Sequence, residues 1–242
     1  MLQITPTPNY SGLEIAGDYY DLEQLYEALH QVVGNEDEHL ELYQARMRVL
    51  GLCYDIRHAF MGNREYTFVD NGLNEDAMEW LGLDDAKGNL YLTFPIYYPE
   101  ILMIVMALND FMDRYESQNA VLKQWDLTVQ TVRKFQAAVI QSLQETLKPQ
   151  TFKMMLNHMS KHSVRFDHYY TQYIDELNIR FLNWDKDQRL KNISIMAKRI
   201  AEQGKEYQKA KQQILEAAQE SNCHPSEIRY NEEYPDFDEI DW

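Results

Sequence analysis

The chain has 242 residues, of which 45% are hydrophobic and 12% are aromatic, and its formal net charge is −16. This length and composition provide enough apolar surface for a sizeable core, which excludes a disordered chain. The charge argues against nucleic-acid binding by the whole protein, because affinity for phosphates comes from Lys and Arg.

The sequence also predicts a cytoplasmic protein without a membrane span. The longest apolar run, residues 101–108, is far shorter than the roughly 20 residues that a membrane helix needs. The first ten residues contain neither a basic leader nor an apolar segment. The two cysteines, Cys53 and Cys223, form no CxxC motif, which fits a reducing compartment.

Residues 1–118 contain eight of the nine glycines and carry a net charge of −15, and they predict an acidic α+β domain with a small sheet. In chain order, we first expect strands at 2–5 and 13–17, a helix from Asp21 to position 34 and a second helix at about 40–60. We then expect a strand at 64–72 that ends in an Asn-Gly turn, a short capped helix at 74–82 and a strand at 88–94. Pro99 suits the first position of a further helix. That helix is apolar nearly all round, so we expect it at the buried centre of the domain.

Residues 119–222 are nearly free of glycine and show apolar stripes with spacings of three and four, which are typical of helices packed on helices. Pro149 and residues 183–188 divide them into a predicted antiparallel bundle of three long helices, the third broken once at Gly204. The stripes are Leu122, Trp125, Val129, Val132, Val139 and Leu143; Met155, Met159, His162, Phe166, Tyr169 and Tyr173; and Ile193, Met196, Ile200, Tyr207 and Ile214.

The stretch CYDIRHAFMGNREY, residues 53–66, is the candidate ligand-binding or catalytic site. On a helix, Asp55 and His58 are adjacent on one face, as are Tyr54 and His58. A carboxylate beside an imidazole suits general acid–base chemistry, and Arg57 and Arg64 would then stabilise an anionic substrate. The alternative is an ordinary surface pair, and we favour it because no nucleophile completes the arrangement.

A weaker candidate for metal binding is the pair His158 and His162, since an HxxxH spacing places both imidazoles on one helix face. The glutamate of the metalloprotease motif is missing, because Met159 follows the first histidine. His162 also belongs to an apolar stripe, so a core or interface histidine is the simpler interpretation. We therefore expect no metal site.

Residues 223–242 form an acidic tail with a net charge of −6 and interleaved aromatic residues. Apolar side chains among carboxylates suit docking on a basic surface. The mildly basic helical region of the same chain competes with a partner protein for this role. The candidate partner-binding residues are Tyr230, Tyr234, Phe237 and Trp242.

No cofactor is expected, because the sequence contains neither the GxGxxG and GxxxxGK[ST] phosphate-binding motifs nor the GxSxG motif of hydrolases. The blocks GDYYDLEQLYEALHQVVGNEDEH, ARMRVLGLCYDIRHAFMGNREYTFVDNG and YYPEILMIVMALNDF, within residues 1–115, resemble an uncharacterised family of bacterial proteins known as a domain of unknown function. The resemblance implies a compact α+β domain and a bacterial cytoplasmic protein, and it implies no activity. Residues from 119 onward are expected to lie outside it.

Two functions from different classes remain open. The first is a non-catalytic regulatory protein, such as an inhibitor or immunity-type protein, that contacts a basic or helical partner or self-associates through its helices. The second is a small-molecule-binding or enzymatic site around Asp55, Arg57, His58 and Arg64. Acidic mimicry of nucleic acid is a third possibility, and simple solubility is the more ordinary explanation of the acidic charge.

Overall fold

The computed structural model describes residues 1–82, 88–118, 121, 125–160, 164–230 and 232–242. Its strands form one antiparallel sheet in the order β1-β2-β4-β3. They are β1 (Gln3–Pro6), β2 (Gly12–Gly17), β3 (Glu65–Val69) and β4 (Asn89–Tyr97). The α-helices are α1 (Tyr19–Val33), α2 (Tyr43–Phe60), α3 (Glu75–Leu81), α4 (Tyr98–Gln118), α5 (Leu127–Thr146), α6 (Pro149–Met159), α7 (Gln172–Leu182), α8 (Lys186–Glu202) and α9 (Lys205–Ser221). The α+β class expected from the sequence is confirmed.

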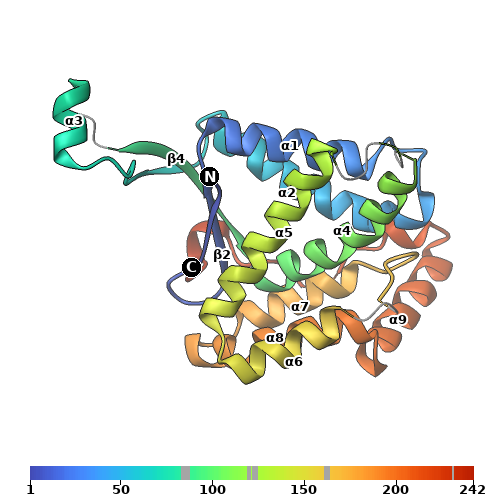
Figure 1. Cartoon of the computed structure of the whole chain (residues 1–242). Coiled ribbons are helices and arrows are strands. Elements are labelled where there is room, and N and C mark those ends of the chain that lie inside the picture. The colour runs from blue at the N-terminus through green and yellow to red at the C-terminus, as the bar shows by residue number, and fades with distance from the viewer. Residues whose placement is uncertain (83–87, 119–120, 122–124, 161–163, 231) are drawn as a thin grey trace.

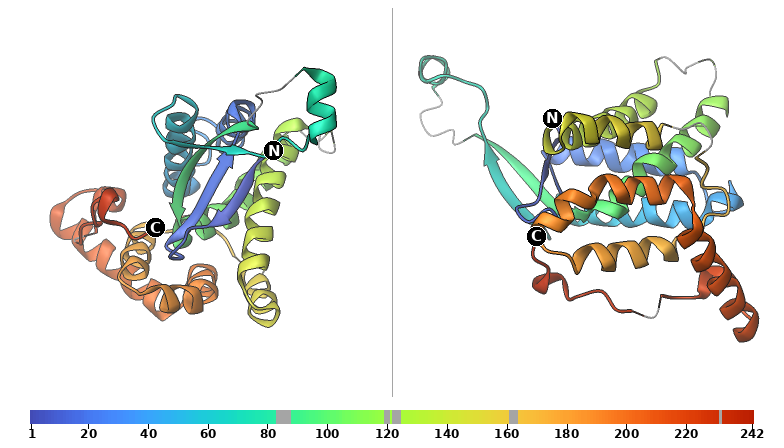
Figure 2. Two further views of the ribbon diagram at one scale, coloured as in Figure 1. Left: turned by 90° about the vertical axis from the view of Figure 1, so that its left-hand side faces the viewer. Right: turned by 90° about the horizontal axis from the view of Figure 1, so that it is seen from below.

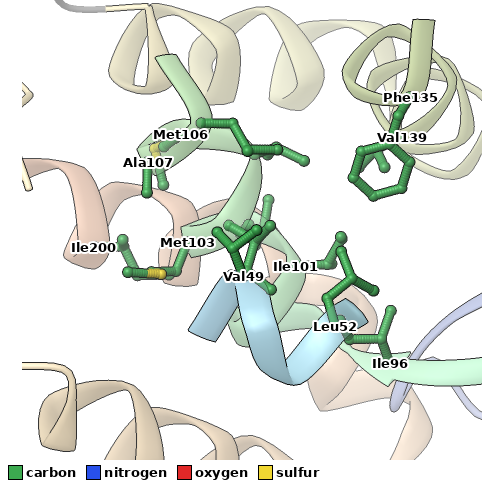
Figure 3. Packing of buried hydrophobic residues seen from close by; sticks show 14 of the residues in the cluster. Val49, Leu52, Ile96, Ile101, Met103, Met106, Ala107, Phe135, Val139 and Ile200 are labelled. Carbon is green, nitrogen blue, oxygen red and sulfur yellow. The ribbon is translucent and has the colours of Figure 1, made fainter. Parts of the chain in front are cut away.

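Helix α4 lies at the centre of the core, as its apolar sequence predicts. It contacts α1, α2, α5, α7 and α8 as well as strands β2 and β4 (Figure 1). Figure 3 shows its residues Ile101 and Met103 packed among side chains from α2, α5 and α8. One hydrophobic cluster therefore joins residues on both sides of position 118, for example Ile101, Phe135 and Ile200.

Local signals set the ends of the first helix. The Asp18 side chain accepts a hydrogen bond from the backbone N–H of Asp21, so α1 begins at Tyr19, slightly earlier than expected. At the other end Gly34 has a φ of 65°, a positive value that glycine adopts without strain. Both helix ends are therefore explained by neighbouring residues alone.

The hairpin of β3 and β4 extends away from the rest of the molecule, with α3 near its end (Figures 1 and 2). We call β3, α3 and residues 89–93 of β4 the arm. Strand β4 continues through Pro95 to Tyr97, further than expected. Pro95 is tolerated there because β3 pairs with β4 only as far as Thr93, which leaves the edge beside Pro95 unpaired.

The helical region differs from the expected three helices. The second stripe was expected on one helix, but α6 ends at Met159 and α7 begins at Gln172. Phe166 and Tyr169 of that stripe are buried in the non-helical connection between them. Trp125, expected in the core, is 82% exposed, and Leu122 and His162 lie outside the described residues. The break at Gly204 is confirmed, since this residue caps the start of α9.

The tail packs on its own chain, running beneath α7 in the right-hand view of Figure 2. The amide of Gln172 in α7 donates to the carbonyls of Pro225 and Ile228 at 2.8 and 2.9 Å. Arg189 of α8 donates to the carbonyl of Asp241 at 2.8 Å. No helix in the described part of the chain combines the length and the apolar composition that a bilayer span requires.

Candidate functional site

A cavity with a volume of about 600 Å³ lies where α2, β4, the start of α4, α7 and the tail meet. This volume lies within the range of small-molecule sites. Its floor is buried and its rim is exposed, since Leu52, Ile96 and Asn178 are buried whereas Tyr54 and Phe237 are exposed. The lining residues are Met47, Arg48, Gly51, Leu52, Tyr54, Asp55, Arg64, Pro95, Ile96, Tyr97, Glu100, Asp175, Asn178, Tyr234, Phe237 and Trp242.

Helix α2 supplies one wall of the cavity. Met47, Gly51, Tyr54 and Asp55 line it, and their spacings of three and four place them on one face of the helix. Arg64, just before β3, donates to the Asp55 carboxylate at 2.8 Å. A Cβ atom added to Gly51 would meet no other atom within 4 Å, so glycine keeps this part of the wall open.

An ionic network crosses the inner part of the cavity. The Arg48 guanidinium donates to Glu100 at 3.2 Å, to Asp175 at 2.6 Å and to the carbonyl of Thr171 at 3.0 Å. Burial alone lowers the pKa of Arg48, but the carboxylates of Glu100 and Asp175 outweigh it and raise that pKa above its ordinary value. The network is therefore held by charge, and Arg48 stays ionised.

Asn178 and Tyr234 extend this network. The Asn178 amide donates to Glu100 at 2.9 Å and to the Tyr234 hydroxyl at 3.0 Å, and that hydroxyl donates to Asp175 at 2.7 Å. Burial, followed by the charges of Asp175 and Glu100, raises the pKa of Tyr234. The buried Asn178 Oδ1 accepts no hydrogen bond from the described residues. One buried acceptor beneath the cavity is thus left without a partner among the described residues.

Aromatic rings form the opposite wall. The Tyr97 ring stacks between Tyr234 and Trp242, with centroid distances of 5.7 and 5.2 Å, and Phe237 lies 5.3 Å from Trp242. Burial, followed by the negative charges of Asp55 and Glu100, raises the pKa of Tyr97 to about 12. The buried Trp242 Nε1 donates to no atom of the described residues.

The structure brings together only part of the predicted site on α2. Tyr54, Asp55 and Arg64 line the cavity, whereas Arg57 and His58 do not. Asp55 pairs with Arg64 rather than with His58. The His58 ring instead packs on Tyr54 at 3.9 Å, and its Nδ1 lies 2.8 Å from the Tyr54 carbonyl oxygen. The arrangement is thus not that of an oriented acid–base pair.

Three of the four tail candidates, Tyr234, Phe237 and Trp242, line the same cavity, whereas Tyr230 lines a neighbouring hollow beside Gln172. The sequence analysis missed ten of the sixteen lining residues, among them the polar and aromatic residues Arg48, Tyr97, Glu100, Asp175 and Asn178. A signal for two of them existed. Arg48 and Glu100 interrupt apolar stretches of α2 and α4, and a charge carried into a core requires a partner there.

His158, one of the two weak metal candidates, does not line this cavity. His158 Nδ1 lies 3.1 Å from Glu202, and His162 falls outside the described residues. Among the residues that the structure describes, no group of three or more His, Cys, Asp or Glu side chains is arranged to hold a metal ion.

Comparison with protein-family models gives a match over nearly the whole chain. A family model described as "Domain of unknown function (DUF6904)" matches residues 2–242. The resemblance to an uncharacterised family is confirmed, but the expectation that residues from 119 onward lie outside it is wrong, because the match includes the helical region and the tail. No curated protein and no solved structure matches the chain.

Proposed function

The chain belongs to the DUF6904 family, a domain of unknown function, and from this premise we propose that it is a non-catalytic protein that binds a small organic cation with an apolar body in the cavity. The observation that carries the proposal is the charge balance of the lining. Both arginines, Arg48 and Arg64, are already engaged by carboxylates. The carboxylates outnumber them, since Asp55, Glu100 and Asp175 all line the cavity.

The remaining chemistry of the cavity supports the same ligand class. Aromatic faces attract cations through their quadrupole, and the rings of Phe237 and Trp242 line the cavity together with the three carboxylates. Burial is the largest cause of the raised pKa of Tyr97 and Tyr234, and the carboxylates are the second cause. Their contribution indicates a negative potential around both hydroxyls.

Binding is favoured over catalysis because the groups suited to acid–base chemistry are engaged or displaced. Asp55 is bound by Arg64, and Glu100 and Asp175 are bound by Arg48. His58 stacks on Tyr54 outside the lining. A general base must reach the proton that it removes, and none of these groups is free to do so.

Titration calorimetry with three probes of matched shape tests the proposal. Phenethylamine is cationic, phenethyl alcohol is neutral and hydrocinnamate is anionic, and all three carry the same phenyl body. We expect phenethylamine to bind most tightly and hydrocinnamate least. Equal affinities, or preference for the anion, would contradict the charge argument.

Two substitutions that each remove one charge should act in opposite directions. Asp55→Asn removes one negative charge from the lining, and we expect it to weaken phenethylamine binding about threefold to tenfold. Arg64→Gln frees the Asp55 carboxylate and should strengthen binding by a similar factor. The matched control is Arg57→Gln, which removes the same charge from the same region outside the lining. If the two lining variants change affinity in the same direction, the site is not cation-selective.

Two further proposals rest on other features. The thiols of Cys53 and Cys223 are both free, which supports a location in the reducing cytoplasm. Contact with a basic or helical protein, as a regulator, inhibitor or immunity-type protein, is a second candidate function. The exposed arm favours a surface interaction of this kind, because it is acidic and its apolar side chains lie open to solvent.

A further inference from the structure

The arm carries large apolar side chains that are exposed to solvent. Tyr66 and Phe68 of β3 pair with Leu92 and Leu90 of β4, so these four side chains share one face of a two-stranded ribbon. Tyr66, Phe68 and Leu90 are exposed on it. A two-stranded ribbon is marginally stable by itself in water, so its uncovered apolar face implies an additional layer or strand.

Strand β3 is a free edge of the sheet. Edge strands of monomers usually carry proline, lysine or a bulge that blocks further pairing. The sequence of β3 is EYTFV, which has neither proline nor lysine, and its register with β4 runs without interruption from Glu65 to Val69. The backbone groups along this edge are therefore available to another strand.

We propose that the chain forms a homodimer in which the β3 strands of two copies pair antiparallel, centred on Thr67. The register itself supports a second copy as the partner. About a two-fold axis at Thr67, Tyr66 of one copy lies opposite Phe68 of the other, and Glu65 lies opposite Val69. Aromatic pairs are thus stacked across the interface, and no like charges face each other.

Antiparallel pairing also directs α3 of each copy toward the base of the partner's arm. Helix α3 carries the carboxylates of Glu75, Asp76 and Glu79, and its Trp80 is 92% exposed. At the base of the arm, the last turn of α2 carries the exposed Arg57, and Met61 after it is exposed as well. An acidic helix with apolar side chains thus meets a cation beside an apolar side chain.

The exposed area sets an upper limit for such a dimer. The apolar side chains involved are Tyr66, Phe68, Trp80, Leu81 and Leu90. At ordinary side-chain sizes their exposed parts amount to roughly 600 Å² per copy, so two copies bury at most roughly 1,200 Å² from these residues. Edge pairing covers the sides of the Tyr66 and Phe68 rings but not the face of the ribbon, so the contacts of α3 with the partner copy and the backbone pairing supply the rest of the interface.

Sedimentation or light scattering at concentrations up to about 100 µM tests the proposal. We expect a dimer for the natural chain. The double variant Tyr66→Lys/Phe68→Lys places ammonium groups opposite each other and should weaken association at least a hundredfold. The matched control is Trp125→Lys/Leu127→Lys, which changes two equally exposed apolar residues away from the arm and should leave association within twofold. A chain that stays monomeric throughout, or a dimer that the arm variant does not weaken, overturns the proposal.

Disulfide crosslinking tests the register directly, in a Cys223→Ser background. Opposed residues of an antiparallel pair have Cα atoms about 4.5–5.5 Å apart, within the range that a disulfide spans. Thr67→Cys should therefore crosslink two copies under mild oxidation. The control Glu65→Cys should not, because the two Glu65 positions lie about 14 Å apart in this register. Equal crosslinking of both variants, or crosslinking of Glu65→Cys alone, overturns the proposed pairing.

Discussion

Replacing Arg48 by methionine tests the ionic network of the cavity most directly. Methionine keeps much of the length and the apolar stem of the side chain, but it removes the donors to Glu100, Asp175 and Thr171. Two carboxylates then remain close together without the cation between them. We expect a large loss of stability at neutral pH, because an uncompensated charge away from water is expensive.

The magnitude follows from the burial of the three charged side chains. Breaking a fully buried pair costs about 3–5 kcal/mol. The side chains of Arg48, Glu100 and Asp175 are 22%, 14% and 20% exposed, so solvent screening reduces the cost to about 3 kcal/mol. For a chain of this size, that loss lowers Tm by about 6–12 °C.

The pH dependence gives the decisive assay. In the variant, the folded state favours protonation of Glu100 or Asp175, so the folded chain binds more protons than the unfolded one. The destabilisation should therefore shrink as the pH falls from neutral to about pH 5. Adding Glu100→Gln and Asp175→Asn should recover at least half of the lost Tm. If calorimetry finds the same loss at both pH values, or if the triple variant is as unstable as the single one, the network is not held by charge.

Three further predictions use single features of the chain. Gly51→Ala should raise the free energy of unfolding by about 0.5–1 kcal/mol in denaturant titrations, because its Cβ meets open space. Gly51→Trp should instead fill the cavity and abolish phenethylamine binding. Unchanged binding would show that the ligand lies elsewhere. Burial raises the pKa of Tyr97, Tyr173 and Tyr207 to about 12 each, above the unfolded value of about 10. The stability that they contribute is thus complete below about pH 10 and is lost above it. Circular dichroism should therefore show unfolding at the same pH at which the absorbance of ionised tyrosine appears, and not at a higher pH. Burial also raises the pKa of the Cys53 thiol to about 12, so an aromatic disulfide reagent should modify Cys223 alone in the folded chain and both thiols after unfolding.

The elements that depend on neighbouring residues were predictable, and those that depend on distant contacts were not. Asp18, Gly34 and Pro99 set helix ends through local hydrogen bonds or φ values, so the sequence places α1 and α4 to within a few residues. The prediction of a helix through Phe166 is wrong, because buried residues can recur at helical spacing without forming a helix. The Phe166 backbone N–H donates to the Asp110 carboxylate at 2.7 Å, a contact made across 56 residues. That bond satisfies the backbone outside a helix.

The candidate site shows the same division. Six of its lining residues were recognisable, because aromatic and charged side chains stood out around Tyr54 and Tyr234. Their meeting was not, because the contacts of Arg48 with Asp175 span 127 residues and join separate helices. A charge in an apolar stripe predicts that some partner exists, and only the way in which α2 and α7 both pack against α4 decides which one.

Helix α2 also explains why ligand binding in the cavity and pairing of two copies can be tested separately. Arg48 and Arg57 are nine positions apart, which at about 100° per residue places them on opposite sides of the helix. Arg48 faces the cavity and binds two carboxylates, whereas Arg57 is exposed at the base of the arm. A substitution of Arg57 therefore tests the contact with a second copy without changing the lining of the cavity. Conversely, Asp55→Asn alters the cavity without removing any group from the proposed β3 pairing, so each proposal fails or stands by its own experiment.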